Sequence, residues 1–388
     1  MQVLDHSHRQ MPIDTPKFLE AALTDIVNQI EFSSDFCITH AKYQPWQLPA
    51  ETVTRYQQLP SDIQNQYLRM RLCDFLYGIY FDGSLKTALA PEVDSVHMQQ
   101  HLENKTYLEV DQEFYQRLHT SNHGKGYFDP GWLVLKEEND NSLAVTKNSL
   151  TLYIKRDRHL QLAEQSARVG DYVKILFPSN QIESAYYIAI ANAGFQGNSN
   201  PDKENKLVSV YFNLSSEGAV AVMDSLTQQL NAISPKARHG VIALPFSFKV
   251  LYNPADYDCY DSGILSFDQR EYPTIYPLLQ SIYLKHQSCF QPEVPLFTKV
   301  LAPGLALAEE PTQKFFEQDN FGRNRCQIVT NGLLVARQKG DESPQGRIAE
   351  IREQFSLMGI DLQHPYLNPK SEDIYTPLDL RTSPQIMS

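Results

Sequence analysis

Strand-like segments follow one another through the middle of the chain, mostly without a helix between them. Residues 150–155 alternate apolar and polar side chains, which is typical of a half-buried strand. Parallel strands need a long crossover between them, whereas antiparallel strands can be joined directly. The order of segments therefore predicts an α+β fold, with a central antiparallel or mixed sheet flanked by helices. Further extended segments are expected at residues 131–136, 171–177, 185–191, 207–213, 241–252, 263–268 and 292–303.

Residues 16–105 show helical periodicity instead. Apolar side chains recur between Phe18 and Ile30 at the spacing of one helix face. Ser61-Asp62 begins a second helix, which we expect to run to about Tyr80. We therefore expect two parts, a helical N-terminal region of residues 1–105 and an α+β sheet domain of residues 106–388, packed as one unit. Later helices are expected at residues 215–233 and 272–286, and from Ser343-Pro344 to just before Gly359.

A hairpin is also expected close to the C-terminal end. Asn331-Gly332 lies between two short apolar runs, and this dipeptide favours the two-residue turns that join antiparallel strands. The pattern predicts a strand pair formed by residues 326–330 and 333–336.

Charge and cysteine content limit the classes of function. The formal net charge of −12 argues against binding to nucleic acid or to an acidic membrane, because both need a positive field. No apolar run is long enough to span a bilayer or to form a secretory signal, so we expect a cytoplasmic protein. The odd number of scattered cysteines, without a CxxC pair, indicates reduced thiols and no metal site: Cys37, Cys73, Cys259, Cys289 and Cys326.

Several familiar catalytic motifs are missing from the sequence. It contains no GxxxxGK[ST] loop, no GxSxG elbow, no HExxH pair and no set of kinase motifs. A nucleotide-binding or metalloprotease function is therefore not indicated.

One segment, residues 119–132, concentrates polar, basic, glycine and aromatic residues. Glycines let a loop approach a ligand closely, so the segment is a candidate site. A structural turn in front of a strand is an equally good interpretation. The side chains of interest are His119, Asn122, His123, Lys125 and Tyr127.

A second candidate is a group of cations in a chain that is otherwise acidic. Side chains two apart on a strand share a face, which places Lys155 on the polar side of its strand. The alternative is an exposed edge strand whose charges discourage aggregation. The group comprises Lys147, Lys155, Arg156, Arg158 and His159.

A third candidate is the pair Arg323 and Arg325. Two arginines around one residue can form a fork for phosphate or carboxylate, although two surface charges are nearly as good an interpretation. Lys249 and Lys299 lie in apolar strand-like segments, where an inward-pointing lysine needs a partner.

The chain resembles the HopA type III effector family, over roughly residues 20–380. The segments that carry the resemblance are LHTSNHGKGYFDPGW, KVLYNPADYDCYDSGIL, QPEVPLFTKVLAPGLALAEEP and FGRNRCQIVTNGLL. The resemblance implies an α+β fold with a central antiparallel sheet. Relatives in class V lanthipeptide and thioamitide pathways are associated with phosphate elimination from serine or threonine phosphorylated by a kinase-like partner. Effectors of plant pathogens in the family are instead described as binding proteins.

The resemblance thus implies a lyase that converts a phosphorylated precursor peptide to dehydroamino acids without metal or organic cofactor. By analogy with phosphothreonine lyases, His123 is the expected acid, with His119 in reserve, and Lys147 is the expected base. Two departures count against activity: the Lys-x-His element is missing before the loop, and Cys259 stands where relatives carry a basic residue. The alternative is a protein- or peptide-binding module without catalysis. Phosphate would be held by Lys155, Arg156, Arg323, Arg325 and Lys249, with Asn122, Lys125 and Tyr127.

Overall fold

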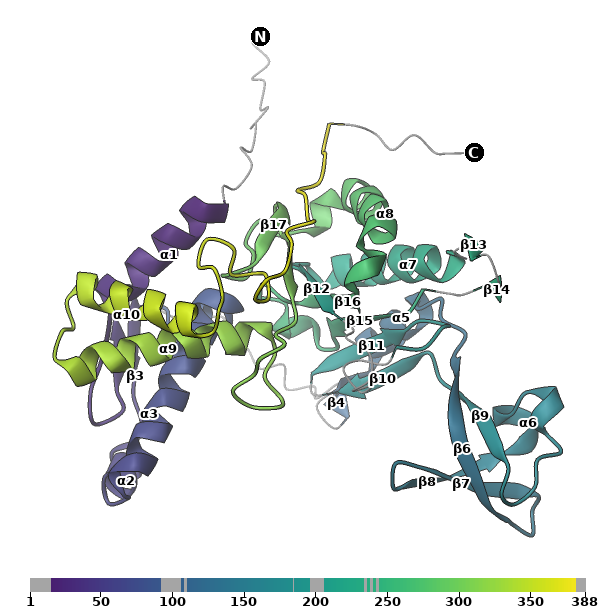
Figure 1. The fold of residues 1–388 in the computed structure, drawn as a ribbon. Helices are drawn as coiled ribbons and strands as arrows, with labels where there is room; N and C mark the ends of the chain where they lie inside the picture. Colours follow the sequence, from purple (N-terminus) through teal and green to yellow (C-terminus); the bar gives the residue numbers. More distant parts are fainter. Residues whose placement is uncertain are drawn as a thin grey trace.

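The computed structural model describes residues 15–91, 106–107, 110–183, 185–195, 206–233, 236–237, 240–241 and 244–381. Figure 1 shows a bundle of helices at one end, a large sheet with its own helices in the middle, and a smaller sheet that projects from the other end. The expected α+β class, with antiparallel sheets and a helical N-terminal region, is confirmed.

The large sheet has seven strands among the described residues, in the order β10-β11-β15-β16-β12-β18-β17, and every neighbouring pair is antiparallel. Its central strands are buried at nearly every position, as expected for a sheet covered on both faces. The strands are β10 (Asn180–Glu183), β11 (Tyr186–Ile190), β12 (Leu207–Phe212), β15 (Phe246–Leu251), β16 (Gly263–Asp268), β17 (Lys299–Ala302) and β18 (Leu305–Glu309).

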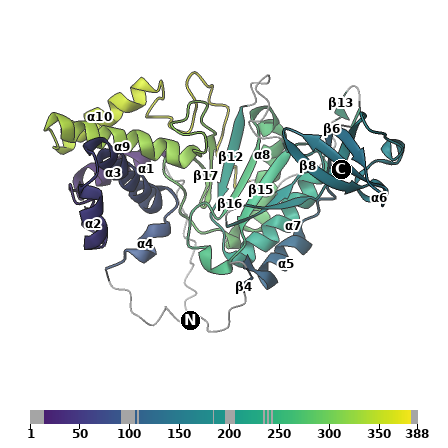
Figure 2. The same ribbon diagram turned by 90° about the horizontal axis from the view of Figure 1, so that it is seen from below.

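Three helices pack beside the large sheet, as Figure 2 shows: α5 (Gln112–Ser121), α7 (Ser216–Ala232) and α8 (Tyr272–Lys285). Local capping explains where two of them begin. The Asp111 side chain accepts a hydrogen bond from the backbone of Phe114, and Ser215 accepts one from Gly218. The two later helices that were expected in this part of the chain are therefore confirmed.

The helical bundle combines both ends of the described chain. Helix α3 packs against α9, and α1 packs against α10. The helix expected to reach about Tyr80 is α-helical only to Leu76 and continues as a π-helix, η1 (Tyr77–Phe81). A small sheet, β1 (Ile30–Phe32), β2 (Ile38–His40) and β3 (Tyr43–Trp46), was not expected. The helices are α1 (Thr15–Gln29), α2 (Ala50–Gln57), α3 (Ser61–Leu76), α4 (Ser84–Ala88), α9 (Phe321–Lys339) and α10 (Pro344–Leu357).

The hairpin expected around Asn331-Gly332 is wrong, because this segment lies inside α9. Gly332 faces α10, where a Cβ atom would lie 2.6 Å from the Cα of Ile351. The glycine therefore allows two helices to approach closely and forms no turn. The burial of α9, which is nearly complete from Phe321 to Thr330, overrides the local turn preference.

The projecting sheet has the order β8-β7-β6-β9 within the described chain, and again all pairs are antiparallel. Helix α6 (Arg156–His159) and the segment after it cover one face and enclose a separate core. The strands are β6 (Tyr127–Glu137), β7 (Ser142–Lys147), β8 (Leu150–Lys155) and β9 (Tyr172–Phe177). That core comprises Trp132, Val134, Leu143, Val145, Ile154, Leu160, Ala167, Val173 and Ile175.

Two short strand pairs complete the fold: β4 (Thr106–Tyr107) with β5 (Val110–Asp111), and β13 (Lys236–Ala237) with β14 (Gly240–Val241). In the part of the chain that the structure describes, no helix has the length and apolar character to cross a bilayer. The expected division at residues 105 and 106 stays a prediction.

Candidate functional site

The loop of residues 122–126 connects α5 to β6. Gly126 has φ of +90°, and a Cβ atom there would lie 2.4 Å from the carbonyl oxygen of Phe177. The side chain of Asn122 donates to the carbonyl of Ser179 at 3.0 Å. The loop therefore packs against the return connection after β9, and its glycines have a structural reason.

His123, the expected acid, lies in this connecting loop and is partly exposed. Its Nε2 lies 2.7 Å from Oδ1 of Asp224 on α7, and 40% of its side chain is exposed. Its backbone N–H donates to Thr227 at 3.1 Å. The carboxylate orients the imidazole, which is what a proton-transfer group needs, but also what an ordinary surface ion pair provides. Lys125, two residues later, is exposed.

The reserve histidine, His119, is tied to a buried tyrosine. Its Nδ1 lies 3.2 Å from the hydroxyl of Tyr187, which also accepts from Asn122 at 3.1 Å. Tyr187 is fully buried, and burial raises the pKa of its hydroxyl to about 12. His119 and Asn122 therefore help to satisfy a buried polar group.

Lys147, the expected base, lies in the projecting sheet. Its ammonium contacts Oδ2 of Asp129 at 2.7 Å and donates to the carbonyl of Pro130 at 2.9 Å. The same carboxylate oxygen accepts from the indole of Trp132 at 2.7 Å. Lys147 contacts Asp129 of β6, whereas His123 contacts Asp224 of α7. Among the described residues, no hydrogen bond or ion pair joins the two.

The cations expected to hold phosphate are distributed over the whole molecule. Arg156 donates to the carbonyls of Gln165 and Ala167 at 2.9 and 2.7 Å, so it fastens the cover of the small core. Lys249 lies 3.7 Å from Glu183 at the edge of the large sheet. Lys155 is exposed on the face opposite the small core.

Arg323 and Arg325 do not form the expected fork, because residues two apart on a helix point in different directions. Arg323 pairs with Asp74 of α3 at 2.5 Å. Arg325 is 1% exposed and donates to the carbonyls of Pro365 and Leu367 at 2.7 and 3.1 Å. Burial lowers the pKa of Arg325 to about 10, and its donors hold the C-terminal segment on the bundle.

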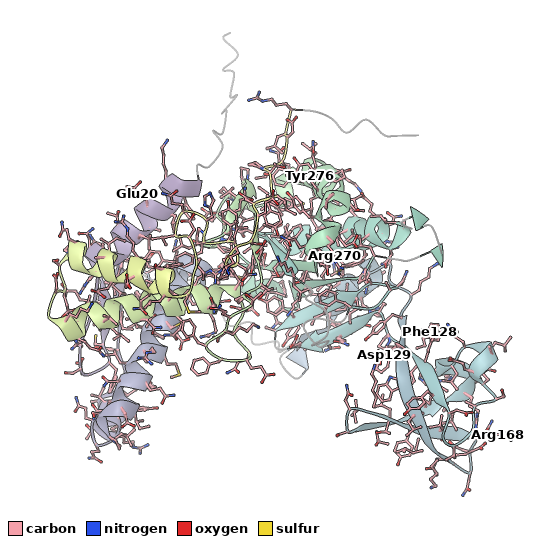
Figure 3. The ribbon with its side chains drawn as sticks, viewed as in Figure 1. Glu20, Phe128, Asp129, Arg168, Arg270 and Tyr276 are labelled. Carbon is pink, nitrogen blue, oxygen red and sulfur yellow. The ribbon has the colours of Figure 1, made fainter. Side chains whose placement is uncertain are left out.

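A groove of about 290 Å3 lies where the start of β6, in the projecting sheet, meets the large sheet. The first residues of β6 form one side of it, including Tyr127 from the candidate loop. Tyr127 stacks on Phe177 with ring centroids 5.8 Å apart. In Figure 3, Phe128 and Asp129 lie at the base of the projecting sheet, beside the part of the body that carries Arg270. The lining residues are Tyr127, Phe128, Asp129, Pro130, Ala193, Gly194, Phe195, Leu207, Pro245, Asp268, Arg270 and Glu271.

The charge of the groove is acidic. Asp129, Asp268 and Glu271 line it together with one guanidinium, that of Arg270. Asp129 is paired with Lys147, so the excess of negative charge in the groove comes mainly from Glu271. Arg270 is held by Asp268 through two contacts of 2.7 Å. An anion such as phosphate is disfavoured here, whereas apolar and basic groups are favoured. Within the described residues, no three His, Cys, Asp or Glu side chains are grouped to hold a metal ion.

Sequence reasoning did not identify Phe195, Arg270 or Glu271 as site residues. They lie far from residues 127–130 in the chain and are brought to them by the packing of the large sheet. Nothing in their local sequence resembles a motif, so only the tertiary structure reveals them.

Comparison with known proteins finds one family that resembles the central and C-terminal parts of the chain. The model of the HopA1 effector protein family matches residues 177–367. Residues 177–367 are therefore similar to this family. The resemblance seen in the sequence is confirmed over this segment, which contains three of its four motif stretches. The HopA1 match is nonetheless narrower than the expected residues 20–380, and the stretch LHTSNHGKGYFDPGW precedes it.

Two solved effector structures from Pseudomonas syringae are similar to this chain. The effector from pv. tomato strain DC3000 is 15% identical and has a TM-score of 0.38, covering 66% of this chain and 80% of its own. The effector from pv. syringae strain 61 is 13% identical with a TM-score of 0.37, covering 66% and 81%. No curated protein matches the chain.

Proposed function

We propose that this chain is a protein-binding module of the HopA1 effector kind, which holds an extended segment of a partner polypeptide in the groove beside β6. The observation that carries the proposal is the lining of the groove. Aromatic and apolar side chains such as Phe128 and Phe195 form its sides, and three carboxylates line it too, two of them in ion pairs with Lys147 and Arg270. Recognition sites for peptides commonly combine apolar pockets with a few placed charges. The favoured segment is apolar with basic residues.

Phosphate elimination is the second candidate and has weaker support. It is favoured by His123, which is partly exposed, is oriented by Asp224 and lies near Lys125. The reaction also needs a base and phosphate-binding cations around one point. Lys147 is instead paired with Asp129 in the projecting sheet, and Arg325 is buried with its donors occupied.

Mass spectrometry of a phosphoserine or phosphothreonine peptide tests the lyase directly, with and without a kinase-like partner. Elimination removes about 98 Da, and a general acid is expected to contribute about a hundredfold or more in rate. A loss that disappears in both His123→Ala and Lys147→Ala would establish the lyase and overturn the preference stated here. An unchanged phosphopeptide removes this candidate.

The groove is tested by selecting peptides from a random displayed library against the whole chain. The affinities of the selected peptides are then measured by fluorescence anisotropy. We expect peptides with a net positive charge, and Glu271→Lys and Phe195→Ala should each weaken binding about tenfold. Glu20→Lys is the matched control, because Glu20 is exposed on α1 at the opposite end of the molecule. Equal affinity for the wild type and both groove variants would refute the proposal.

A further inference from the structure

The projecting sheet has one covered and one uncovered face. Successive side chains on a strand point to opposite faces, and directly paired residues share a face. Val134, Val145 and Val173 point into the small core under α6. On the other face, the register pairs Thr151 with Thr146, Thr146 with Leu133, and Leu133 with Tyr172.

The uncovered face exposes large apolar side chains. Tyr153 and Tyr172 are 71% and 72% exposed, and Leu135 is 45% exposed. In the described part of the chain, seven of the fifteen exposed large hydrophobic residues lie between residues 127 and 177, and three of these, Leu135, Tyr153 and Tyr172, lie on this face. Exposed apolar side chains grouped on one face indicate a contact surface for another molecule.

The charges on this face differ from those of the rest of the molecule. Lys136, Lys155 and Lys174 occupy outward positions on three different strands, and none of the outward positions of the four strands carries Asp or Glu. Lys136 pairs at 2.9 Å with Glu138, which lies just beyond the strand end. Residues 127–177 contain seven Lys or Arg and seven Asp or Glu, so the formal charge of −12 belongs to the remaining residues.

One edge of this sheet is also open. Among the described residues, β8 pairs with β7 alone, so its other edge has no strand partner. The opposite edge, at β9, is partly covered, because Leu160 bridges to Ile175 and Glu164 accepts from the backbone of Lys174. An extended segment can join an open edge through backbone hydrogen bonds while its side chains lie on the face.

From these observations we infer that the outward face of the projecting sheet, together with the β8 edge, is a second docking surface that binds an acidic, extended segment of a partner protein. This surface is separate from the groove, and the inference does not require the groove to bind anything. Carboxylates of the partner pair with Lys136, Lys155 and Lys174. Its apolar side chains pack on Leu133, Leu135, Tyr153 and Tyr172. Lysines at an open edge discourage the unselective addition of other strands. An acidic segment can pair with these lysines, so the edge selects for it.

Charge favours a protein segment over single-stranded nucleic acid. Lysines and aromatic rings on a four-stranded sheet could also stack bases. A nucleic acid, however, is a long polyanion that would extend from this small face onto a body carrying the whole negative charge of the chain. A short acidic segment stays within the face, and its aliphatic contacts suit Leu133 and Leu135.

The test is a selection from a random peptide library on the whole chain, with counter-selection against the triple variant Lys136→Glu/Lys155→Glu/Lys174→Glu. We expect enriched peptides with net negative charge, which bind the wild type at least tenfold more tightly than the triple variant by fluorescence anisotropy. Tyr153→Ser should weaken binding without a change in charge. A control variant makes the same change of charge at exposed positions outside this face, Lys125→Glu/Arg158→Glu/Arg168→Glu, and should bind like the wild type.

Three outcomes would overturn the inference. The first is that no peptide is enriched, and the second is that the enriched peptides bind the triple and control variants equally. The third is that a labelled oligothymidine binds the face more tightly than the peptides do. Thermal unfolding of each variant, monitored by circular dichroism, distinguishes a folded variant that no longer binds from a variant that no longer folds. Glu271→Lys in the groove should leave this binding unchanged, so the two surfaces can fail independently.

Discussion

Asp261 is a buried carboxyl between the π-helix and the large sheet, and its replacement by asparagine should stabilise the protein in a pH-dependent way. The residue is 4% exposed, and the hydroxyl of Tyr77 donates to its Oδ2 at 3.5 Å. Burial raises the pKa of Asp261 to about 7, and the nearby carboxylate of Asp82 raises it further in the same direction. Below the usual pKa of an unfolded aspartate, the carboxyl is protonated in both states.

The sign and size of the effect follow from this difference in pKa. Because the native pKa is above the unfolded pKa, the wild type loses stability as the pH rises from about 4 to about 7. At 1.36 kcal/mol per pKa unit, the loss is about 1–2 kcal/mol at pH 5 and about 4 kcal/mol at pH 8. Asp261→Asn cannot ionise, so the stability that it gains should be about 2–3 kcal/mol larger at pH 8 than at pH 5.

Urea unfolding of the wild type and Asp261→Asn at both pH values measures this difference. Any fixed cost of burying the amide is the same at each pH and cancels in the comparison. Asp258→Asn is the matched control, because Asp258 is exposed in the same loop and its replacement should show no such difference. A difference below about 1 kcal/mol for Asp261→Asn would show that the native carboxyl is not held in its neutral form.

Two further predictions concern packing and the ion pair of the projecting sheet. Gly332→Val should destabilise the bundle by about 2 kcal/mol or more, because the new side chain meets the backbone of Ile351. Asn331→Ala changes the neighbouring residue and should destabilise the protein less. Thermal unfolding of both variants measures the difference. Lys147→Met removes the ammonium that pairs with Asp129 at 2.7 Å, and it should destabilise by about 1–3 kcal/mol by leaving a half-buried carboxylate. Faster amide exchange limited to β6–β9 is the expected signature, and unchanged exchange there would contradict it.

Much of the secondary structure follows from local sequence. The alternation in residues 150–155 gives β8 because one face of the strand is buried. Ser215 and Ser343 begin α7 and α10 by accepting hydrogen bonds from backbone N–H groups that no helical carbonyl can reach. Gly359 has φ of +67° just beyond the end of α10, as the sequence predicted. These signals act over a few residues, and the sequence alone therefore determined the α+β class and most of the element positions.

The tertiary structure decided where the chemistry-bearing side chains meet. The same turn signal that is reliable in isolation failed at Asn331-Gly332, because two helices needed a glycine where they pack. His123 and Lys147 are close in the chain, yet they contact α7 and β6 respectively, since the chain leaves the body after residue 126. The groove and the uncovered sheet face depend on strand pairing and on which face is buried. Such contacts join residues far apart in the chain, and no local pattern encodes them.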